Sequence, residues 1–429
     1  MMNEIMIKRH REHRELRGHR EHRGFRGHRG LMLLLAALLL VVVGCSEDDD
    51  RDALRQKSMV EVVPCVSSYN DIDADTGSNP DVEPITRADL WPPTGYKLYH
   101  ELTGVNGILR SNETAPIAVF FTSGTTQVAH LDNTTVPHRF VYNSSTTSWR
   151  IDEELENAGE YLLYGFVPYS AATNAVIGTN STFENEAILT LNGLNSVMNQ
   201  DVCVIVGAKN GKKEDNIIVP VEYPKTGEFA CTIHKSETNP NYIYLLFDHL
   251  YAALRFRFRV DETYAALRTI KLKKLELLAY QDEACTRLMT KKVKTVVTLR
   301  PNHTNTSPIV YAIEFTPDGG GDMSPVLIYD NESNPVALPT GNEWTESIGF
   351  VPKTSSYYLL TSTYDVYDKQ GNLIRQNCTA DNKINPRKLF QKESLDRGYM
   401  YTMKLLVKPT YLYMLSEPDL DNPTMVIAD

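Results

Sequence analysis

The sequence contains little cysteine and little tryptophan, and it lacks the short motifs that mark the common enzyme classes. Its 429 residues include six Cys and three Trp, and no two cysteines have the CxxC spacing of a zinc or redox site. HExxH, GxSxG, a P-loop and a dinucleotide-binding glycine motif are all missing. His130 and His138 have no acidic or cysteine partner at metal-ligand spacing. We therefore expect a protein without catalytic residues, metal ion or cofactor; a surface hydrolase is the least favoured alternative.

The sequence also lacks an apolar run long enough to span a membrane. The longest run, Leu31–Val43, has 13 residues, whereas a membrane-spanning helix needs about 20. A basic stretch precedes it, and the small Gly44 follows it. This order is typical of a secretory signal, so we predict that residues 1–44 are a signal peptide with a basic leader. An RNA-binding arm is the alternative, and a start codon at Met32 or nearby stays open.

Beyond this leader the chain is acidic. Residues 1–44 hold nine Lys or Arg and four Asp or Glu, which leaves 35 basic and 50 acidic residues in the remainder. Such a balance disfavours a nucleic-acid partner. Residues 45–87 are acidic and turn-rich apart from "MVEVVPCV", and we interpret them as a tether or a cleavable pro-segment. Asp71, Asp73 and Asp75 alternate as in a calcium loop, but its glycine and closing glutamate are misplaced.

The junction between the apolar run and the acidic segment carries a cysteine. The tetrapeptide "VVGC", residues 42–45, resembles the lipobox of bacterial lipoproteins. This resemblance implies cleavage before Cys45 and a lipid on its thiol, which holds a protein at a membrane. The alternative is a cysteine that merely ends an apolar segment. The following "SEDDD" resembles the acidic signal of surface-exported lipoproteins, which implies the outer face of the outer membrane.

From Ala88 onward the apolar residues alternate with polar ones. In "HLYAALRFRFRV" one face holds Leu254, Phe256, Phe258 and Val260, and the other holds Arg255, Arg257 and Arg259. This period predicts strands of an antiparallel sheet with one wet face; the arginines as a ligand patch are the alternative. The lysines of "LKKLE" are expected on a wet face too. Only "DETYAAL" and "NPRKLFQKES" read as short helices. Many short strands predict an all-β fold of β-sandwiches, which we divide at residues 88–238 and 239–429.

Four stretches of this strand region resemble the fimbrillin family, the subunits of fimbriae on Gram-negative anaerobes. The first contains a Trp followed by an aromatic-rich strand that ends in a Pro-Tyr pair; the others are "NQDVCVIVGAK", the Phe-x-His-Leu strand, and "RGYMYTMKLLVKP". The residues that carry the first and third are Trp149, Tyr161, Tyr164, Phe166, Pro168, Tyr169, Phe247, His249 and Leu250. The resemblance covers most of residues 110–410 and implies two tandem transthyretin-like antiparallel β-sandwich domains.

In fimbrillins that polymerise, a trypsin-like protease removes an N-terminal strand, and the resemblance implies such a site at Arg87-Ala88. A lost strand leaves a sheet edge that an extended segment of another subunit can fill. The C-terminal apolar groups are the candidate donor strand: Tyr411, Leu412, Tyr413, Met414, Leu415, Met425, Val426 and Ile427. The alternative is that this segment completes its own sandwich. The chain lacks the closing Trp of the family, which leaves shaft, anchor and tip roles open.

The favoured interpretation is a structural subunit of a surface fimbria, exported as a lipoprotein, assembled by strand exchange and supporting adhesion. Its partners would be other fimbrial subunits, the outer membrane through Cys45, and host or bacterial surface ligands. The alternative is a monomeric surface lipoprotein that binds glycan or a host protein, with Trp91 and Trp344 available to stack on sugars. A "MVEVVPCV" strand that pairs into the first sandwich and is removable after Arg87 favours assembly, and a dangling one favours binding.

Overall fold

A computed structural model provides the structure of the chain. Every residue described below lies in one compact unit, Gln56–Asp429. No helix among the described residues is both long and apolar enough to cross a membrane. The structure describes residues 59–73, 95–101, 114–123, 136–151, 155, 158–179, 186–214, 217–220, 226–235, 240–300, 310–354, 356–411 and 418–427.

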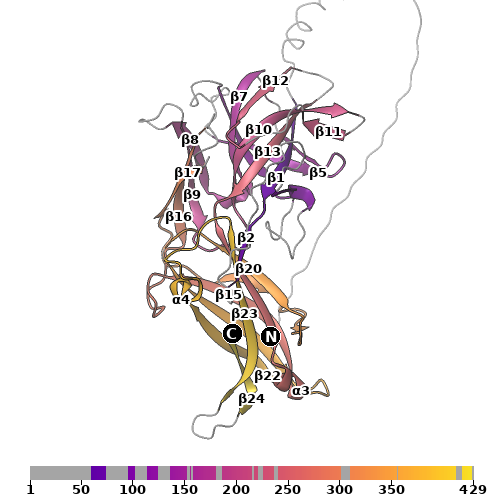
Figure 1. The fold of residues 1–429 in the computed structure, drawn as a ribbon, viewed down its shortest axis with the longest axis vertical. Helices are drawn as coiled ribbons and strands as arrows, with labels where there is room; N and C mark the ends of the chain where they lie inside the picture. Colours follow the sequence, from indigo (N-terminus) through magenta and orange to yellow (C-terminus); the bar gives the residue numbers. More distant parts are fainter. Residues whose placement is uncertain are drawn as a thin grey trace, which may run out of the picture. The chain divides into compact units, whose positions relative to one another are not determined.

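The chain is all-β, as the alternating sequence predicts, and its largest sheet has ten strands (Figure 1). Their order is β11-β10-β13-β1-β6-β5-β4-β7-β12, with β3 paired to β1. Because β10 also pairs with β7, the strands from β10 through β1 to β7 close into a barrel-like ring of seven. The ten strands are β1 Val60–Ser67, β3 Tyr96–Leu98, β4 Ile117–Ser123, β5 His138–Asn143, β6 Ser148–Ile151, β7 Gly159–Val167, β10 Cys203–Glu214, β11 Ile217–Pro220, β12 Ala230–Ile233 and β13 Asn241–His249.

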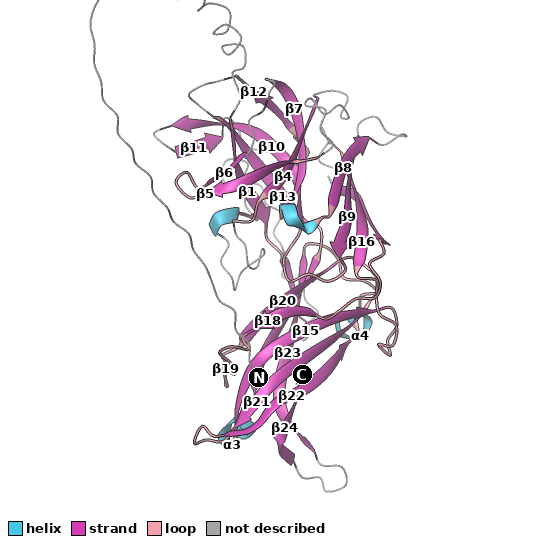
Figure 2. Cartoon of the chain, turned by 180° about the vertical axis from the view of Figure 1, so that it is seen from behind, coloured by secondary structure: helices cyan, strands magenta, loops and turns pink. Residues whose placement is uncertain are grey.

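Three smaller sheets complete the fold, and Figure 2 shows them from behind. A four-stranded sheet has the order β17-β16-β9-β8, and two five-stranded sheets have the orders β2-β23-β14-β20 with β24 on β23, and β18-β15-β21-β22 with β19 on β15. Their strands are β2 Asn70–Asp73, β8 Asn174–Thr179, β9 Ala187–Asn195, β14 Ala252–Val260, β15 Thr269–Tyr280, β16 Lys292–Leu299, β17 Val310–Pro317, β18 Val326–Asp330, β19 Val336–Ala337, β20 Thr345–Val351, β21 Tyr357–Tyr367, β22 Leu373–Ile384, β23 Tyr399–Tyr411 and β24 Pro418–Ile427.

Helices are short and lie in the connections. The described residues form α3 Glu262–Leu267 and α4 Pro386–Phe390, and the 3-10 turns η1 Tyr99–Glu101 and η2 Tyr169–Ala171. Both α-helices fall in the two stretches that the sequence marks as helical, so that prediction is confirmed. Each begins at a side-chain cap: Asp261 accepts from two backbone N–H groups of α3, and Asn385 does the same for α4.

Two hydrophobic cores organise these sheets. One lies in the ten-stranded and four-stranded sheets, and the other lies between the two five-stranded sheets. The predicted boundary at 238/239 does not separate them, because β13 belongs to the first sheet and pairs with β10. Strand β16 also pairs with β9 in the four-stranded sheet, and β17 pairs with β16 on its other side. Strand partners that lie far apart in sequence leave no local signal of such pairing.

The N-terminal segment is part of both cores, which corrects its interpretation as a tether. Within residues 45–87 the structure describes two strands, β1 in the ten-stranded sheet and β2 on the edge of β23. Three of the strand pairs are parallel: β1 with β13, β14 with β23, and β2 with β23. The expectation of purely antiparallel sheets is therefore wrong. Parallel pairing joins strands that are distant along the chain, as the N-terminal strands are here.

Candidate functional site

The strand β1 is the feature of the fold that bears most directly on function. Seven consecutive residues, from Val60 to Val66, pair in parallel with β13. On its other side β1 pairs antiparallel with β6 at two positions and with β3 at three. It is therefore an interior strand of the seven-stranded ring, as Figure 1 shows beside β13. The "MVEVVPCV" segment is therefore a paired strand and does not dangle; its removal after Arg87 stays a prediction.

The composition of β1 explains why it lies inside. Its sequence, VEVVPCVS, is rich in β-branched residues, which favour strands. Both faces of the strand are buried, and its apolar side chains therefore follow one another without polar alternation. Pro64 has no N–H to donate, yet its position in the register is kept opposite β13. The buried apolar side chains of β1 are Val60, Val62, Val63, Cys65 and Val66, each no more than 7% exposed.

One charged side chain of β1 is buried as well, and it is fully paired. Glu61 is 1% exposed. Its Oε1 accepts from Nη2 of Arg150 at 2.6 Å and from Nε of the same side chain at 3.2 Å. Its Oε2 accepts from the Ser148 hydroxyl at 2.7 Å. Because a buried carboxylate is costly unless paired, these bonds from β6 fix the register of β1 in the ring.

Most of the residues predicted as sites lie outside the described part of the chain. These are Cys45, Arg87, Ala88, Leu412, Tyr413, Met414 and Leu415. Tyr411 ends β23, and Met425, Val426 and Ile427 lie in β24. Strand β24 pairs antiparallel with β23 of its own chain, from Leu405 opposite Ile427 onward. In this structure the C-terminal segment therefore pairs within its own chain, as in the alternative interpretation that it completes its own sandwich.

The edge of β23 is shared between the two ends of the chain. Residues 399–402 of β23 pair with β2, and residues 405–411 of the same strand pair with β24. The N-terminal and C-terminal segments therefore lie in succession along one strand. Sequence reasoning could not find this arrangement, because neither segment carries a signal that names its partner.

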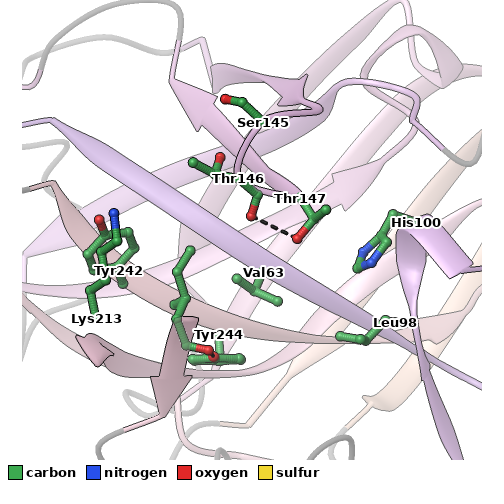
Figure 3. Close-up of a pocket in the computed structure, with 10 residues that line it drawn as sticks. Val63, Leu98, His100, Ser145, Thr146, Thr147, Lys213, Tyr242 and Tyr244 are labelled. Carbon is green, nitrogen blue, oxygen red and sulfur yellow. Dashed lines mark hydrogen bonds between the residues drawn. The ribbon is translucent and has the colours of Figure 1, made fainter. Parts of the chain in front are cut away.

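A pocket of about 580 Å³ lies against β1 (Figure 3). Val63 of β1 lies between Tyr244 and Leu98 in this view. Among the described residues, Nδ1 of His100 has no hydrogen-bond partner. The other lining residues are Ser145, Thr146, Thr147, Lys213, Ile218 and Tyr242. Aromatic faces beside hydroxyl groups suit a polar ligand with apolar patches.

A fully buried polar cluster lies at the end of β1. Nδ1 of His249 lies 2.7 Å from Oδ2 of Asp201 and 3.3 Å from Sγ of Cys203. Nε2 of His249 lies 2.6 Å from the carbonyl oxygen of Ser67, the last residue of β1. Tyr69 stacks on the His249 ring at 3.7 Å and donates to Oδ1 of Asp201 at 2.9 Å. Burial, with the Asp201 charge beside it, raises the pKa of the Cys203 thiol and of the Tyr69 phenol.

In the sequence, His249 stands out only as part of the Phe-x-His-Leu strand. Its partners are 46 and 48 positions away, and only the pairing of Cys203 opposite His249 brings them together. Asp201 and Cys203 share a side because they are two residues apart in extended chain. The sequence signal for this cluster is the i, i+2 spacing of Asp201 and Cys203, and such a spacing is too common to indicate a site.

No family model matches the chain, and no curated protein does. Among solved structures, a putative cell adhesion protein from Bacteroides fragilis is 13% identical, with 86% of this chain and 97% of that chain covered and a TM-score of 0.37. A putative cell adhesion protein from Bacteroides uniformis is 12% identical, with 87% and 99% covered and a TM-score of 0.35. The fimbrial anchor protein Mfa2 from Porphyromonas gingivalis is 10% identical, with 85% and 95% covered and a TM-score of 0.24. The chain is similar to fimbrial and cell adhesion proteins. Likeness at this level assigns no function, so the proposals below rest on the chain's own residues.

Proposed function

We propose that the chain is a structural subunit of a surface fimbria that assembles by strand exchange and supports adhesion. The observation that carries the proposal is the position of β1 inside the closed ring, paired on both sides. The strand precedes Arg87-Ala88, the predicted protease site. A cut there would leave β1 attached to the barrel by non-covalent contacts alone.

Burial of β1 contributes so much to stability that we do not expect the ring to stay open after the strand leaves. Its four valines are at least 93% buried, and burial of one such side chain contributes roughly 1.5 to 3 kcal/mol. Together they contribute on the order of 6 to 12 kcal/mol, which is as large as the net stability of a typical domain. A cleaved subunit therefore requires another strand in the vacated groove, and a neighbouring subunit supplies one by strand addition.

The same cut would open the second core. Strand β2 also precedes Arg87, and its departure would free residues 399–402 of β23 beside β24. The C-terminal segment of a neighbouring subunit, with its apolar groups from Tyr411 to Leu415 and from Met425 to Ile427, is the proposed donor. Its release from β23 is the conformational step that assembly requires.

The proposal includes export and anchoring. The leader and Cys45 would bring the chain to the outer membrane as a lipoprotein, with the acidic residues after Cys45 directing it to the surface. Its partners would be other fimbrial subunits and surface ligands of host or bacterial cells, without a cofactor or catalytic step. The two cores would correspond to two tandem transthyretin-like β-sandwich domains, with β1 and β2 contributed by the pro-segment.

The test is limited proteolysis of the full-length Cys45→Ser chain, which cannot be lipidated. After brief trypsin treatment, mass spectrometry reads the new N-terminus, and gel filtration and SDS gels read assembly. We expect a cut after Arg87 followed by SDS-resistant ladders. Arg87→Gln is the matched control, and it should be cut elsewhere without assembling.

A disulfide across the strand pair separates cleavage from strand release. Val62 and Ile243 are opposite each other in β1 and β13, so Val62→Cys with Ile243→Cys should hold β1 in place. This variant should be cut after Arg87 yet assemble only after reduction. A cut chain that keeps β1, or that loses β1 and still stays monomeric, would contradict the proposal.

The pocket beside β1 supports a second candidate, a monomeric lipoprotein that binds glycan. Its lining combines Tyr242, three consecutive hydroxyl residues and the exposed Lys213. Binding of oligosaccharides to the uncleaved monomer, measured by a glycan array and calorimetry, should weaken in Thr146→Val if this pocket is the site. Unchanged binding in that variant, or none in the parent chain, would contradict this candidate.

A further inference from the structure

The buried cluster of Asp201, Cys203 and His249 plays no part in the assembly proposal. Asp201 and Cys203 are 0% exposed and His249 is 1% exposed. One nitrogen, one oxygen and one sulfur converge from the start of β10 and the end of β13, all within 4.8 Å of one another. These are the three donor types that bind zinc in proteins.

The spacing of the three donor atoms is close to that of a tetrahedral metal site. Bonds of about 2.0 to 2.1 Å to nitrogen and oxygen and about 2.3 Å to sulfur hold such donors roughly 3.3 to 3.6 Å apart. Here Sγ lies 3.3 Å from Nδ1 and 3.6 Å from Oδ2, and Nδ1 lies 2.7 Å from Oδ2. To reach tetrahedral separation, the nitrogen–oxygen pair has to open by about 0.6 Å and the nitrogen–sulfur pair by about 0.3 Å, whereas the oxygen–sulfur pair already fits.

The outer contacts of the cluster match those that orient metal ligands. In metal sites the ligating histidine donates its other N–H to a carbonyl or carboxylate, and the ligating carboxylate is itself hydrogen-bonded. His249 directs Nε2 to the Ser67 carbonyl oxygen at 2.6 Å, and Oδ1 of Asp201 accepts from Tyr69 at 2.9 Å. The second polar atom of the histidine and that of the aspartate are therefore already hydrogen-bonded outside the cluster. Nδ1, Oδ2 and Sγ are left facing one another.

The three donor atoms face one another. A carbonyl oxygen only accepts, so Nε2 of His249 donates to Ser67, and Nδ1 is the nitrogen that lies 2.7 Å from Oδ2 of Asp201. Sγ of Cys203 lies beside both of these atoms. The cluster with carboxylate, thiolate, neutral imidazole and a divalent cation has zero net charge, which burial favours.

We propose that Asp201, Cys203 and His249 bind a divalent transition-metal ion, with zinc as the best match to the donor set. Binding displaces to solvent the protons that the three donor atoms hold, and it transfers no electrons. The fourth ligand is not among these three side chains, so a water molecule or another small ligand completes the site. Ser67 ends β1, Tyr69 follows it, and both contact the cluster. A bound ion would therefore stabilise the position of β1 in the ring.

Cobalt(II) provides the test, since a cobalt–thiolate bond gives a near-ultraviolet charge-transfer absorption that histidine ligands do not give. The full-length Cys45→Ser chain is the parent, so that neither the leader histidines nor the leader thiol can produce this band. After removal of metal with a chelator, we expect one equivalent of cobalt to produce the band and one equivalent of zinc to abolish it.

Three variants make the assignment specific. Cys203→Ser should abolish the band, whereas Cys231→Ser, which alters another buried cysteine of the same sheet, should keep it. Tyr69→Phe keeps the stacked ring but removes the hydrogen bond to Asp201, so cobalt should bind about 10- to 100-fold more weakly with the band intact. Circular dichroism checks the fold of each variant.

The parent protein decides the question even where a variant fails to fold. Absence of the band from the folded parent chain at saturating cobalt would overturn the proposal. A band that survives in Cys203→Ser, or that disappears equally in folded Cys231→Ser, would also overturn it. None of these readouts depends on cleavage or assembly.

Discussion

Truncation of Val62 is the most direct test of β1 as an interior strand of the barrel. Val62 is 0% exposed and lies opposite Trp149 of β6 and Ile243 of β13. Val62→Ala removes two methyl groups, at about 0.8 kcal/mol each by transfer, and leaves a cavity that adds to this loss. We expect a decrease in the free energy of unfolding of about 2 to 3 kcal/mol, which is roughly a 30- to 150-fold change in the folded-to-unfolded ratio.

The assay is urea unfolding followed by the fluorescence of Trp149, which is itself 0% exposed in the same core. The midpoint should fall with an unchanged dependence on urea concentration. Val176→Ala is the matched control, because this valine of β8 is 41% exposed and its truncation should change stability by no more than about 0.5 kcal/mol.

Equal, small effects of the two truncations would refute the reasoning. Such a result would mean that β1 does not occupy the ring in solution. The energetic argument for strand replacement after cleavage would then lose its basis.

Two further predictions concern backbone packing and a helix cap. A Cβ at Gly165 would lie 2.0 Å from the Ala118 carbonyl oxygen, whereas one at Gly178 would meet nothing within 4 Å. Gly165→Ala should therefore lower the free energy of unfolding by about 3 kcal/mol or more, read as a lower thermal midpoint, whereas Gly178→Ala should leave it nearly unchanged. Asp261, whose pKa is lowered chiefly by a hydrogen bond from the Thr263 hydroxyl, caps α3, and Asp261→Ala should cost about 1 kcal/mol at neutral pH. Because the folded pKa is depressed, that difference is present above a pH of about 4 and disappears as the pH falls through the folded pKa; a variant that matches the parent at pH 7 in chemical unfolding would contradict the cap.

The strands themselves could be predicted because their signal is local. In β14 the residues Leu254, Phe256 and Phe258 are buried, and the arginines between them are half-exposed, as the period of two requires. The same reasoning failed for Lys273 in "LKKLE". This lysine is 6% exposed, because the register of β15 shifts beside it and its Nζ donates to Asn377 at 2.7 Å. A bulge reverses the face of a side chain, and alternation alone does not reveal where a bulge occurs.

The partners of the strands could not be predicted, and neither could the sites that depend on them. Glu61 meets Arg150 across 89 positions of sequence, and His249 meets Asp201 across 48. Such contacts form only after chain closure over long loops, whose cost depends little on the residues inside them. The sequence therefore contains no local mark of either pairing.

By itself, the sequence determined the all-β class, alternating strands such as β14, and the two short helices, since each depends on neighbouring residues. Only the tertiary structure decided that the N-terminal segment contributes strands to both cores, that β1 pairs in parallel with β13 and β2 with β23, and that an aspartate, a cysteine and a histidine meet at the end of β1. The physical reason is that hydrophobic period and turn chemistry act within a few residues, whereas burial of β1 on both faces requires the whole barrel around it.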